Sequence, residues 1–156
     1  MPRLEDLSEI ERAAALNFPF MEHDDSPNHP LSKPLSECKI ALVTTAGLHV
    51  RGDRPFFHGD QTYRIIPEKT HPKDILQSHV SIGFDRVPVY KDINVSYPID
   101  RLRELAATGK VASLSSIYIS FMGAQRNPRH IIEEAAPEVS TLLKNEGVDL
   151  VLITPT

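Results

Sequence analysis

The stretch Lys39–Gly47 reads KIALVTTAG, a short apolar run that is rich in β-branched residues and ends on a glycine. A buried parallel strand has this composition, because both of its faces are covered and polar residues need not alternate with apolar ones. The stretch Val148–Thr156, VDLVLITPT, has the same character. We therefore predict that each stretch forms a buried parallel strand.

Helix and strand patterns alternate between these two runs. A helix is predicted over Pro98–Thr108, with Asp100 as its cap. Residues 111–123, VASLSSIYISFMG, are typical of a strand, and residues 127–147 are predicted to form a helix or a helix pair broken at Pro137. This alternation predicts a single-domain α/β fold, a mostly parallel three-layer (Rossmann-like) sheet with helices on both faces.

The remaining segments are less regular. Apolar residues at helical spacing from Leu4 to Ala14 predict an amphipathic first helix, and residues 19–34 have four prolines and no periodicity. We predict a division into an amino-terminal helix with a proline-rich arm, residues 1–34, and an α/β domain, residues 35–156. A short strand is expected at Tyr63–Ile66 and a short helix at residues 71–80, HPKDILQSHV.

The composition excludes several classes of protein. A formal net charge of -4 provides no basic surface, which argues against a nucleic-acid partner. No apolar run approaches the roughly 18 residues that span a bilayer, and the first residues are too acidic for a secretory signal. The single cysteine, Cys38, agrees with a reducing compartment. We expect a cytoplasmic protein with no membrane partner.

The densest polar region lies between His79 and Leu105, where charged and amide groups precede the predicted helix at Pro98. We predict a pocket built from His79, Asp85, Arg86, Asp92 and Asn94. Among these, His79, Asp85 and Asp92 are candidate catalytic residues, because a histidine exchanges protons near neutral pH and a carboxylate can orient it. The competing interpretation is helix capping and hydrogen bonding within loops.

Two arginines are candidates for binding a substrate carboxylate. Arg64 and Arg86 each carry a planar guanidinium that can donate two parallel hydrogen bonds. The alternative is a structural ion pair, of Arg64 with Asp60 or of Arg86 with Asp85. The sequence leaves both interpretations open.

Further binding groups are expected at strand ends and in extended segments. Thr44 and Thr45 close the first predicted strand, where their hydroxyls can hold an anion. Asp92 and Asn94 lie two residues apart, so in an extended segment both side chains point to one side and can share a ligand. We include Thr44, Thr45 and Asn94 among the substrate-binding candidates.

A metal site is a weaker alternative. His49, His58 and His79 are suitable ligand types, but their spacings of nine and twenty-one residues match no compact metal signature. We therefore predict no metal site, with these three histidines as the alternative. Cys38 precedes the first predicted strand and is expected to be structural.

Several motifs together resemble one family. They are LVTTAGLHVRGDRPF, GDQTYRIIP, SHVSIGFDR, DINVSYPIDRLREL, SFMGA and GVDLVLITP, and they cover most of the chain from Lys39 onward. This combination resembles the selenoprotein B family of glycine, sarcosine, betaine and D-proline reductases, particularly its short members. The resemblance implies a reductase-like domain that acts on a small amine or amino acid.

The resemblance also implies cofactors and partners. A pyruvoyl group on a partner subunit would activate the amine, a selenocysteine or cysteine would attack the carbon next to nitrogen, and dithiol donors would complete the reductive C–N cleavage. No cofactor is expected in this chain itself, and a homo-oligomer is expected. A departure from the family lies at Ile117–Ile119, where a histidine near Tyr118 is expected in many relatives, so no proton transfer is assigned to this place. Tyr118 itself is included among the substrate-binding candidates.

One departure concerns the redox atom. In the family, the strand that resembles VDLVLITP is followed by the selenocysteine or cysteine, so we expect that atom to lie beyond Thr156. The chain is then a subunit, or a fragment ended at a selenocysteine codon, or a short homologue without redox chemistry. Two other functions stay open: a non-catalytic small-molecule-binding or assembly module, and an enzyme that uses histidine and carboxylate groups, with or without a metal.

Overall fold

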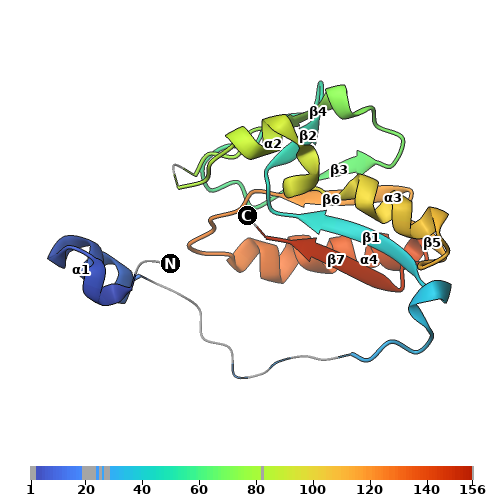
Figure 1. Cartoon of the computed structure of the whole chain (residues 1–156), viewed down its shortest axis with the longest axis horizontal. Helices are drawn as coiled ribbons and strands as arrows, with labels where there is room; N and C mark the ends of the chain where they lie inside the picture. Colours follow the sequence, from blue (N-terminus) through green and yellow to red (C-terminus); the bar gives the residue numbers. More distant parts are fainter. Residues whose placement is uncertain (1–2, 19–23, 25, 27–28, 82, 156) are drawn as a thin grey trace.

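The computed structural model describes residues 3–18, 24, 26, 29–81 and 83–155. Its centre is a mostly parallel sheet whose strands alternate with helices (Figure 1). The sheet strands are β1 (Lys39–Thr44), β3 (Tyr63–Pro67), β5 (Ser113–Leu114), β6 (Ile117–Phe121) and β7 (Leu150–Thr154). Only β3 runs antiparallel to its neighbour β6. The α/β class and the mostly parallel sheet are thus confirmed, and the Rossmann-like assignment stays a prediction.

The register of β1 sets the strand order. Ile40 pairs with Leu114 of β5 and with Leu150 of β7. Since a strand has two edges, β5 and β7 lie on opposite sides of β1. Val43 likewise pairs with one residue of β6 and one residue of β7, so β6 lies on the opposite side of β1 from β7. β5 and β6 therefore share one edge of β1 and follow one another along it. The lateral order is therefore β3, β6 with β5, β1 and β7, with β7 at the border of the sheet. β7 is parallel as predicted, but the prediction that it is buried was wrong, because a border strand has a neighbour on one side only and none of its residues is buried.

The alternation of side chains along the strands builds two cores. Ile40, Leu42 and Tyr118 pack with Leu102 of α3 (Ile99–Ala107) on one face of the sheet. The intervening residues, such as Ala41 and Ile119, pack with Val139 of α4 (Ala136–Asn145) on the other. Successive strand residues point to opposite faces, so one helix contacts each face.

Shorter elements surround this centre. β2 (Leu48–Val50) and β4 (Ile75–Gln77) form a separate antiparallel pair above the sheet in Figure 1. The predicted first helix is confirmed as α1 (Glu9–Leu16), which begins with a reciprocal cap: Ser8 Oγ accepts from Glu11 N, and the Glu11 carboxylate accepts from Ser8 N. The other helical segments are η1 (Leu4–Asp6), η2 (Leu35–Glu37), η3 (Pro72–Asp74), α2 (Val87–Lys91), η4 (Ile93–Val95) and η5 (Ile131–Ala135). None of the helices in the described part of the chain is long and apolar enough to cross a membrane.

Two local predictions were wrong, and a third is decided in favour of one of its two alternatives. Residues 71–80 form η3 and β4 rather than a helix, because pairing with β2 supplies backbone partners that a short helix would lack. Asp100 lies inside α3, and its N–H donates to the Asn94 side chain, so the capping group comes from η4. Pro137 does not break the last helix: η5, a π-helical segment, continues directly into α4, where Pro137 occupies the first turn. A proline cannot donate a hydrogen bond to the preceding turn, and the wider π-helical turn of η5 lies directly before it.

Candidate functional site

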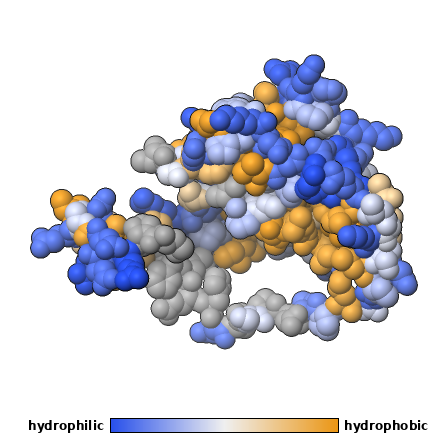
Figure 2. All heavy atoms as spheres, in the orientation of Figure 1, coloured by the Kyte–Doolittle hydropathy of each residue, from blue (hydrophilic) through white to orange (hydrophobic). Residues whose placement is uncertain are grey.

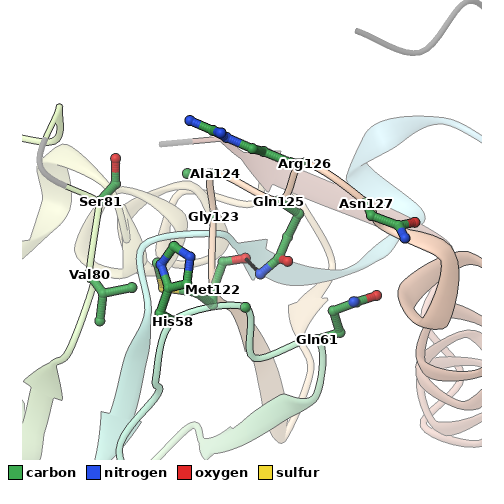
Figure 3. A pocket seen from close by; sticks show the side chains of 11 residues that line it. His58, Gln61, Val80, Ser81, Met122, Gly123, Ala124, Gln125, Arg126 and Asn127 are labelled. Carbon is green, nitrogen blue, oxygen red and sulfur yellow. Dashed lines mark hydrogen bonds between the residues drawn. The ribbon is translucent and has the colours of Figure 1, made fainter. Parts of the chain in front are cut away.

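A pocket of about 410 Å³ lies beside the carboxyl end of β6. Its wall is the loop that follows β6, and the other sides come from the segment after β4 and the segment before β3 (Figure 3). The lining residues are His58, Gly59, Gln61, Val80, Ser81, Met122, Gly123, Ala124, Gln125, Arg126 and Asn127. Open α/β sheets bind ligands outside the carboxyl ends of their parallel strands. We therefore treat this pocket as the candidate site.

The loop after β6 is held in a specific shape. The Gln125 side chain donates through Nε2 to the backbone oxygens of Asp60 at 2.8 Å and Met122 at 3.1 Å. Ala124 has a φ of 56°, in the left-handed region that non-glycine residues rarely adopt. Such strained residues gather at ligand sites and are kept by the surrounding contacts. The loop is thus built to present its side chains to the pocket.

The charge of the pocket lining is positive. Arg126 is exposed and has no ion-pair or hydrogen-bond partner within the described ranges. The lining contains no aspartate, glutamate or cysteine, and His58 is its other titratable side chain. A guanidinium binds carboxylates through two parallel hydrogen bonds. The pocket is therefore suited to a small ligand that carries an anionic group.

His79 lies next to the pocket segment in sequence but is itself 2% exposed. Its Nδ1 accepts from Ser81 N at 3.3 Å, and its ring packs 4.5 Å from the Phe84 ring. Its Nε2 has no hydrogen-bond partner in the described part of the structure. Burial lowers the pKa of the His79 imidazole, and the positive charge of Arg86 lowers it further. His79 is thus held in its neutral form.

Acidification from about pH 7.5 to about pH 5.5 is expected to reduce stability through His79. The unfolded chain takes up a proton near the ordinary pKa of about 6.5, whereas the folded imidazole has a lowered pKa and resists protonation. The unfolded state then binds more protons than the folded state, so the free energy of unfolding decreases as the pH is lowered through this window. Urea denaturation at both pH values measures the fall, which should be smaller in His79→Gln; an identical pH dependence in both proteins contradicts the prediction.

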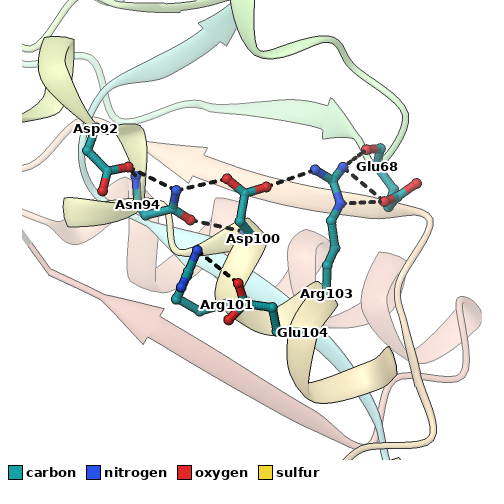
Figure 4. A network of polar contacts seen from close by, with 7 residues as sticks. All are labelled: Glu68, Asp92, Asn94, Asp100, Arg101, Arg103 and Glu104. Carbon is teal, nitrogen blue, oxygen red and sulfur yellow. Dashed lines mark hydrogen bonds and ion pairs between the residues drawn. The ribbon is translucent and has the colours of Figure 1, made fainter. Parts of the chain in front are cut away.

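Asp92 and Asn94 are tied to the start of α3 rather than to the pocket (Figure 4). The Asp92 carboxylate accepts from Asn94 N and Nδ2, both at 2.9 Å, and the hydrogen bonds from Asn94 lower the pKa of Asp92. Asn94 also donates to the Asp100 carboxylate and accepts from Asp100 N. Arg103 extends the network from Asp100 to Glu68 at the end of β3. These bonds position α3 on the sheet.

Asp85 and Arg86 lie on the exposed side of the same region. The Asp85 carboxylate accepts from Val87 N at 2.9 Å, which opens α2. Arg86 has no ion pair in the described part of the chain. None of the five residues of the pocket predicted from sequence lines the pocket after β6. Their functional roles stay predictions, and the contacts observed for Asp85, Asp92 and Asn94 are those of loop and helix geometry.

Arg64 makes an internal ion pair. Its Nη2 lies 2.9 Å from the Asp60 carboxylate, and its other nitrogens donate to Arg54 O, Thr62 Oγ1 and Tyr63 O. The guanidinium also lies 4.3 Å over the Phe56 ring. These contacts use most of its donors, so the geometry agrees with the structural alternative for Arg64.

Thr44 and Thr45 join the ends of β1 and β7. Thr44 Oγ1 and Thr154 Oγ1 each donate to Ser96 O at 2.8 Å, and Thr45 N donates to Thr154 O at 3.2 Å. Thr44 is fully buried. Tyr118, the remaining substrate-binding candidate, is also fully buried, within the core under α3. Neither Thr44 nor Tyr118 lines the pocket.

Tyr118→Phe is expected to stabilise the chain by about 1–2 kcal/mol, because a buried hydroxyl without a partner carries its desolvation cost uncompensated. The Tyr118 hydroxyl has no partner among the described residues, and burial raises its pKa. Thermal and urea denaturation measure the change. A clear loss of stability would show that the hydroxyl has a partner in solution.

The candidate metal ligands do not lie close to one another in the described part of the structure. No three His, Cys, Asp or Glu side chains come together to hold a metal within the described ranges, which include His49, His58 and His79. His49 Nδ1 lies 3.2 Å from Val50 O. Cys38 is fully buried, with its sulfur 3.3 Å from Pro34 O at the amino end of β1.

Sequence reasoning missed the loop of Ala124, Gln125 and Arg126. A signal for it existed, because this loop directly follows the predicted strand of residues 111–123. The rule that ligands bind beyond the carboxyl ends of parallel strands points to such a segment. The longer polar run after His79 gives a stronger signal in the sequence, but its polar groups mostly bind one another.

The fold is an α/β domain with a pocket beyond the carboxyl end of β6. The family model described as glycine/sarcosine/betaine reductase selenoprotein B (GRDB) matches residues 9–156. The chain therefore belongs to this family, as its motifs predicted.

The relatives found by sequence comparison are named as subunits of reductases of this family. The chain is 42% identical over 126 residues to the D-proline reductase subunit gamma of Acetoanaerobium sticklandii, covering 80% of this chain and 51% of the relative. It is 30% identical to the glycine reductase complex component B subunit gamma of Carboxydothermus hydrogenoformans, over 89% of this chain and 33% of the relative. For the sarcosine reductase complex component B subunit beta of Peptoclostridium acidaminophilum the identity is 28%, with the same coverage.

The chain thus spans about half the length of the first of these relatives and a third of the other two. No solved structure matches it.

Proposed function

We propose that this chain is the part of a selenoprotein B reductase subunit that holds a small amine or amino-acid substrate, and that the redox atom comes from outside these 156 residues. The observation that carries the proposal is the placement of two groups. The pocket with Arg126 lies beyond the carboxyl end of β6, whereas Cys38, the single thiol of the sequence, is fully buried before the start of β1. A nucleophilic thiol must be an accessible thiolate, so Cys38 does not fit the redox role.

The pocket chemistry supports the substrate class. The names of the relatives refer to D-proline, glycine and sarcosine, and each of these molecules combines a carboxylate with an amine. Arg126 would bind the carboxylate. Gln125 uses its side-chain nitrogen to hold the loop, so its oxygen is the group left to accept from the amine. His58 also lines the pocket and would act as a general acid or base.

The reductase complex would supply the remaining groups. A pyruvoyl group on a partner subunit provides a carbonyl that activates the substrate amine, and a selenocysteine or cysteine provides the reducing nucleophile. This chain would bind and orient the substrate and shield it from water on the side of the β6 loop. A cytoplasmic location and a homo-oligomer remain part of the proposal.

Arg126→Ala is expected to weaken binding of D-proline by at least about tenfold, because a hydrogen bond to a charged group contributes about 1.5–3 kcal/mol and 1.4 kcal/mol is a factor of ten. Isothermal titration calorimetry of the purified chain measures the affinity. Arg129→Ala is the matched control, since Arg129 is an exposed arginine at the start of the following helix and pairs with Glu133. Equal affinities of both variants would move the substrate site elsewhere.

The chain alone is also expected to show no reduction of D-proline by dithiothreitol. Cys38→Ser should behave in the same way, because the Cys38 thiol is not accessible. Reduction that disappears in Cys38→Ser would overturn the proposal.

A non-catalytic binding module is the second candidate. It is favoured by the lining of the pocket, which contains neither a thiol nor a carboxylate. Binding of D-proline without any reduction after the remaining subunits of the reductase complex have been added would support this module over the reductase. The histidine and carboxylate enzyme has less support, because only His58 of its required groups lines the pocket.

A further inference from the structure

One wall of the candidate pocket is formed by Val80 and Ser81, which follow β4. Figure 3 shows these two residues on one side of the pocket and Gln61 and Asn127 on the other. Residues 78–81 belong to no helix or strand, so no regular ladder of backbone hydrogen bonds fixes their position. The position of this wall therefore depends on individual contacts.

The base of the wall is attached to the sheet. Ser78 N donates to Gly47 O at 2.9 Å, just beyond β1, and Gly47 N donates to Phe121 O at the end of β6, also at 2.9 Å. Gly47 lies so close to His79 that a Cβ on the glycine would be 3.0 Å from His79 N. His79 itself is 2% exposed. His79 is thus the fixed point from which the wall extends.

The His79 imidazole folds back onto the wall. Its Nδ1 accepts a hydrogen bond from Ser81 N at 3.3 Å, whereas its Nε2 has no partner in the described part of the structure. Ser81 O accepts from Phe84 N at 3.4 Å, and the Phe84 ring packs against the imidazole with 4.5 Å between the ring centroids. The imidazole is therefore held by the turn whose first residue, Ser81, lines the pocket.

The hydrogen bond from Ser81 requires a neutral imidazole. A backbone N–H donates and does not accept, so Nδ1 of His79 has to be the unprotonated nitrogen of the ring. An imidazolium carries a proton on both nitrogens and cannot accept a hydrogen bond. Protonation of His79 therefore breaks its bond to Ser81 and places a charge among buried groups, which is unfavourable.

The surroundings of the ring also disfavour its protonated form. Burial lowers the pKa of the His79 imidazole most, and the positive charge of Arg86 at the start of α2 lowers it further. The other residues found against His79, Gly47 and Phe84, carry no titratable group. None of residues 81 and 83–86 is buried, and Figure 2 shows hydrophilic residues beside apolar ones on the surface of α2. A displaced imidazolium therefore reaches water on this side.

We propose that His79 is a positioning residue for the pocket after β6: its neutral imidazole holds the wall of Val80 and Ser81, and protonation of the imidazole releases that wall. A ligand then has to order the wall as it binds, which reduces its affinity. Binding of a carboxylate ligand should thus weaken in mild acid, although the ligand carboxylate and the Arg126 guanidinium keep their charges there. For an amino-acid ligand, this inference rests on the function proposed above.

NMR of the free chain tests the contact itself. The imidazole signals of His79 report its protonation, and hydrogen exchange of the Ser81 amide, relative to an unstructured peptide at the same pH, reports its protection. Between about pH 7.5 and about pH 5, we expect this protection to fall about two- to tenfold, the effect of one net hydrogen bond. The fall should follow the titration of His79. Protection that is independent of this titration would overturn the proposal.

Two substitutions of His79 separate the acceptor from the ring. In His79→Asn a side-chain oxygen takes the place of Nδ1 and accepts at every pH, so Ser81 should stay protected; His79→Leu has no acceptor and should leave it unprotected throughout. His71→Asn is the matched control. His71 Nδ1 also accepts from the backbone N–H two residues on, Lys73 N at 3.2 Å, but His71 is exposed and does not line the pocket. This variant should behave as the wild-type chain.

Calorimetry with D-proline tests the consequence for binding. Over the same pH range, we expect the Kd to rise about two- to tenfold in the wild-type chain and in His71→Asn, and clearly less in His79→Asn. His58 lines the pocket in all of these proteins, so the difference between them isolates His79. Because coupling is reciprocal, bound D-proline should also shift the titration of His79 to lower pH.

The outcomes separate this inference from the proposed function. An equal pH dependence of binding in the wild-type chain and in His79→Asn would assign that dependence to another group and overturn the inference. If D-proline binds at no pH, the function proposed above fails, and the inference then stands or falls on the exchange of the Ser81 amide. That measurement on the wild-type chain needs neither a ligand nor a substitution that could disturb folding.

Discussion

Replacing Asp60 with asparagine is expected to lower the free energy of unfolding by about 3 kcal/mol, because removing one partner of a buried ion pair costs about 3–5 kcal/mol. The Asp60 side chain is 1% exposed and the Arg64 side chain 12%. Arg64 keeps its other hydrogen bonds and its contact with Phe56, which places the effect at the lower end. Chemical denaturation measures the loss, and the melting temperature should fall by about 6–12 °C at about 2–4 °C per kcal/mol.

The control is an ion pair of the same type at the surface. Asp74 pairs with Arg51 at 3.2 Å, but both side chains are more than half exposed. Asp74→Asn should therefore change stability by less than about 1 kcal/mol. Equal effects of the two substitutions would mean that the Asp60–Arg64 pair is not the source of the stability.

Acid should remove the contribution of Asp60 as well. Burial by itself raises the pKa of the Asp60 carboxyl, but hydrogen bonds from Thr62 and the nearby Arg64 guanidinium outweigh it and hold this pKa below its usual range. The stabilisation is therefore present above the ordinary pKa of about 3.9 and is lost as the pH falls through the lower folded value. This window lies below the one expected for His79, so the two contributions are separable.

Gly47→Ala is expected to destabilise the chain by about 2–3 kcal/mol. Gly47 has a φ of 65°, and a Cβ at this position would lie 3.0 Å from the backbone nitrogen of His79. Strained backbone costs about 1–3 kcal/mol, and overpacking adds a similar amount when backbone must move. The same shift displaces His79, so the pH dependence assigned to that residue should also change.

Gly109→Ala separates the two causes. Gly109 has a φ of 71°, but a Cβ there would meet no atom within 4 Å. This variant therefore reports the backbone strain alone, about 1 kcal/mol. Urea denaturation of both variants should show a clearly larger loss for Gly47→Ala, and similar losses would show that the backbone of His79 yields to the added methyl group.

The sequence by itself determined the class of fold and the family. KIALVTTAG and VDLVLITPT are mostly apolar and rich in β-branched residues, and they pair as the parallel strands β1 and β7. Their strand type followed from the sequence, but the place of β7 at the border of the sheet, where it is only partly covered, did not. The helix at Ile99–Ala107 followed from spacing that depends on neighbours within one turn. The family motifs are likewise local strings. Such features are set by residues close together in the chain, and they need no knowledge of distant contacts.

Only the tertiary structure decided which polar groups meet. Asp92 and Asn94 resemble site residues in the sequence, yet their hydrogen bonds are to each other and to Asp100. Arg126 is inconspicuous in the sequence, yet it lines the pocket because the β6 loop, the β4 loop and the segment before β3 converge there. Whether a polar side chain faces a ligand or a neighbour depends on segments tens of residues away, and that information enters only when the sheet assembles.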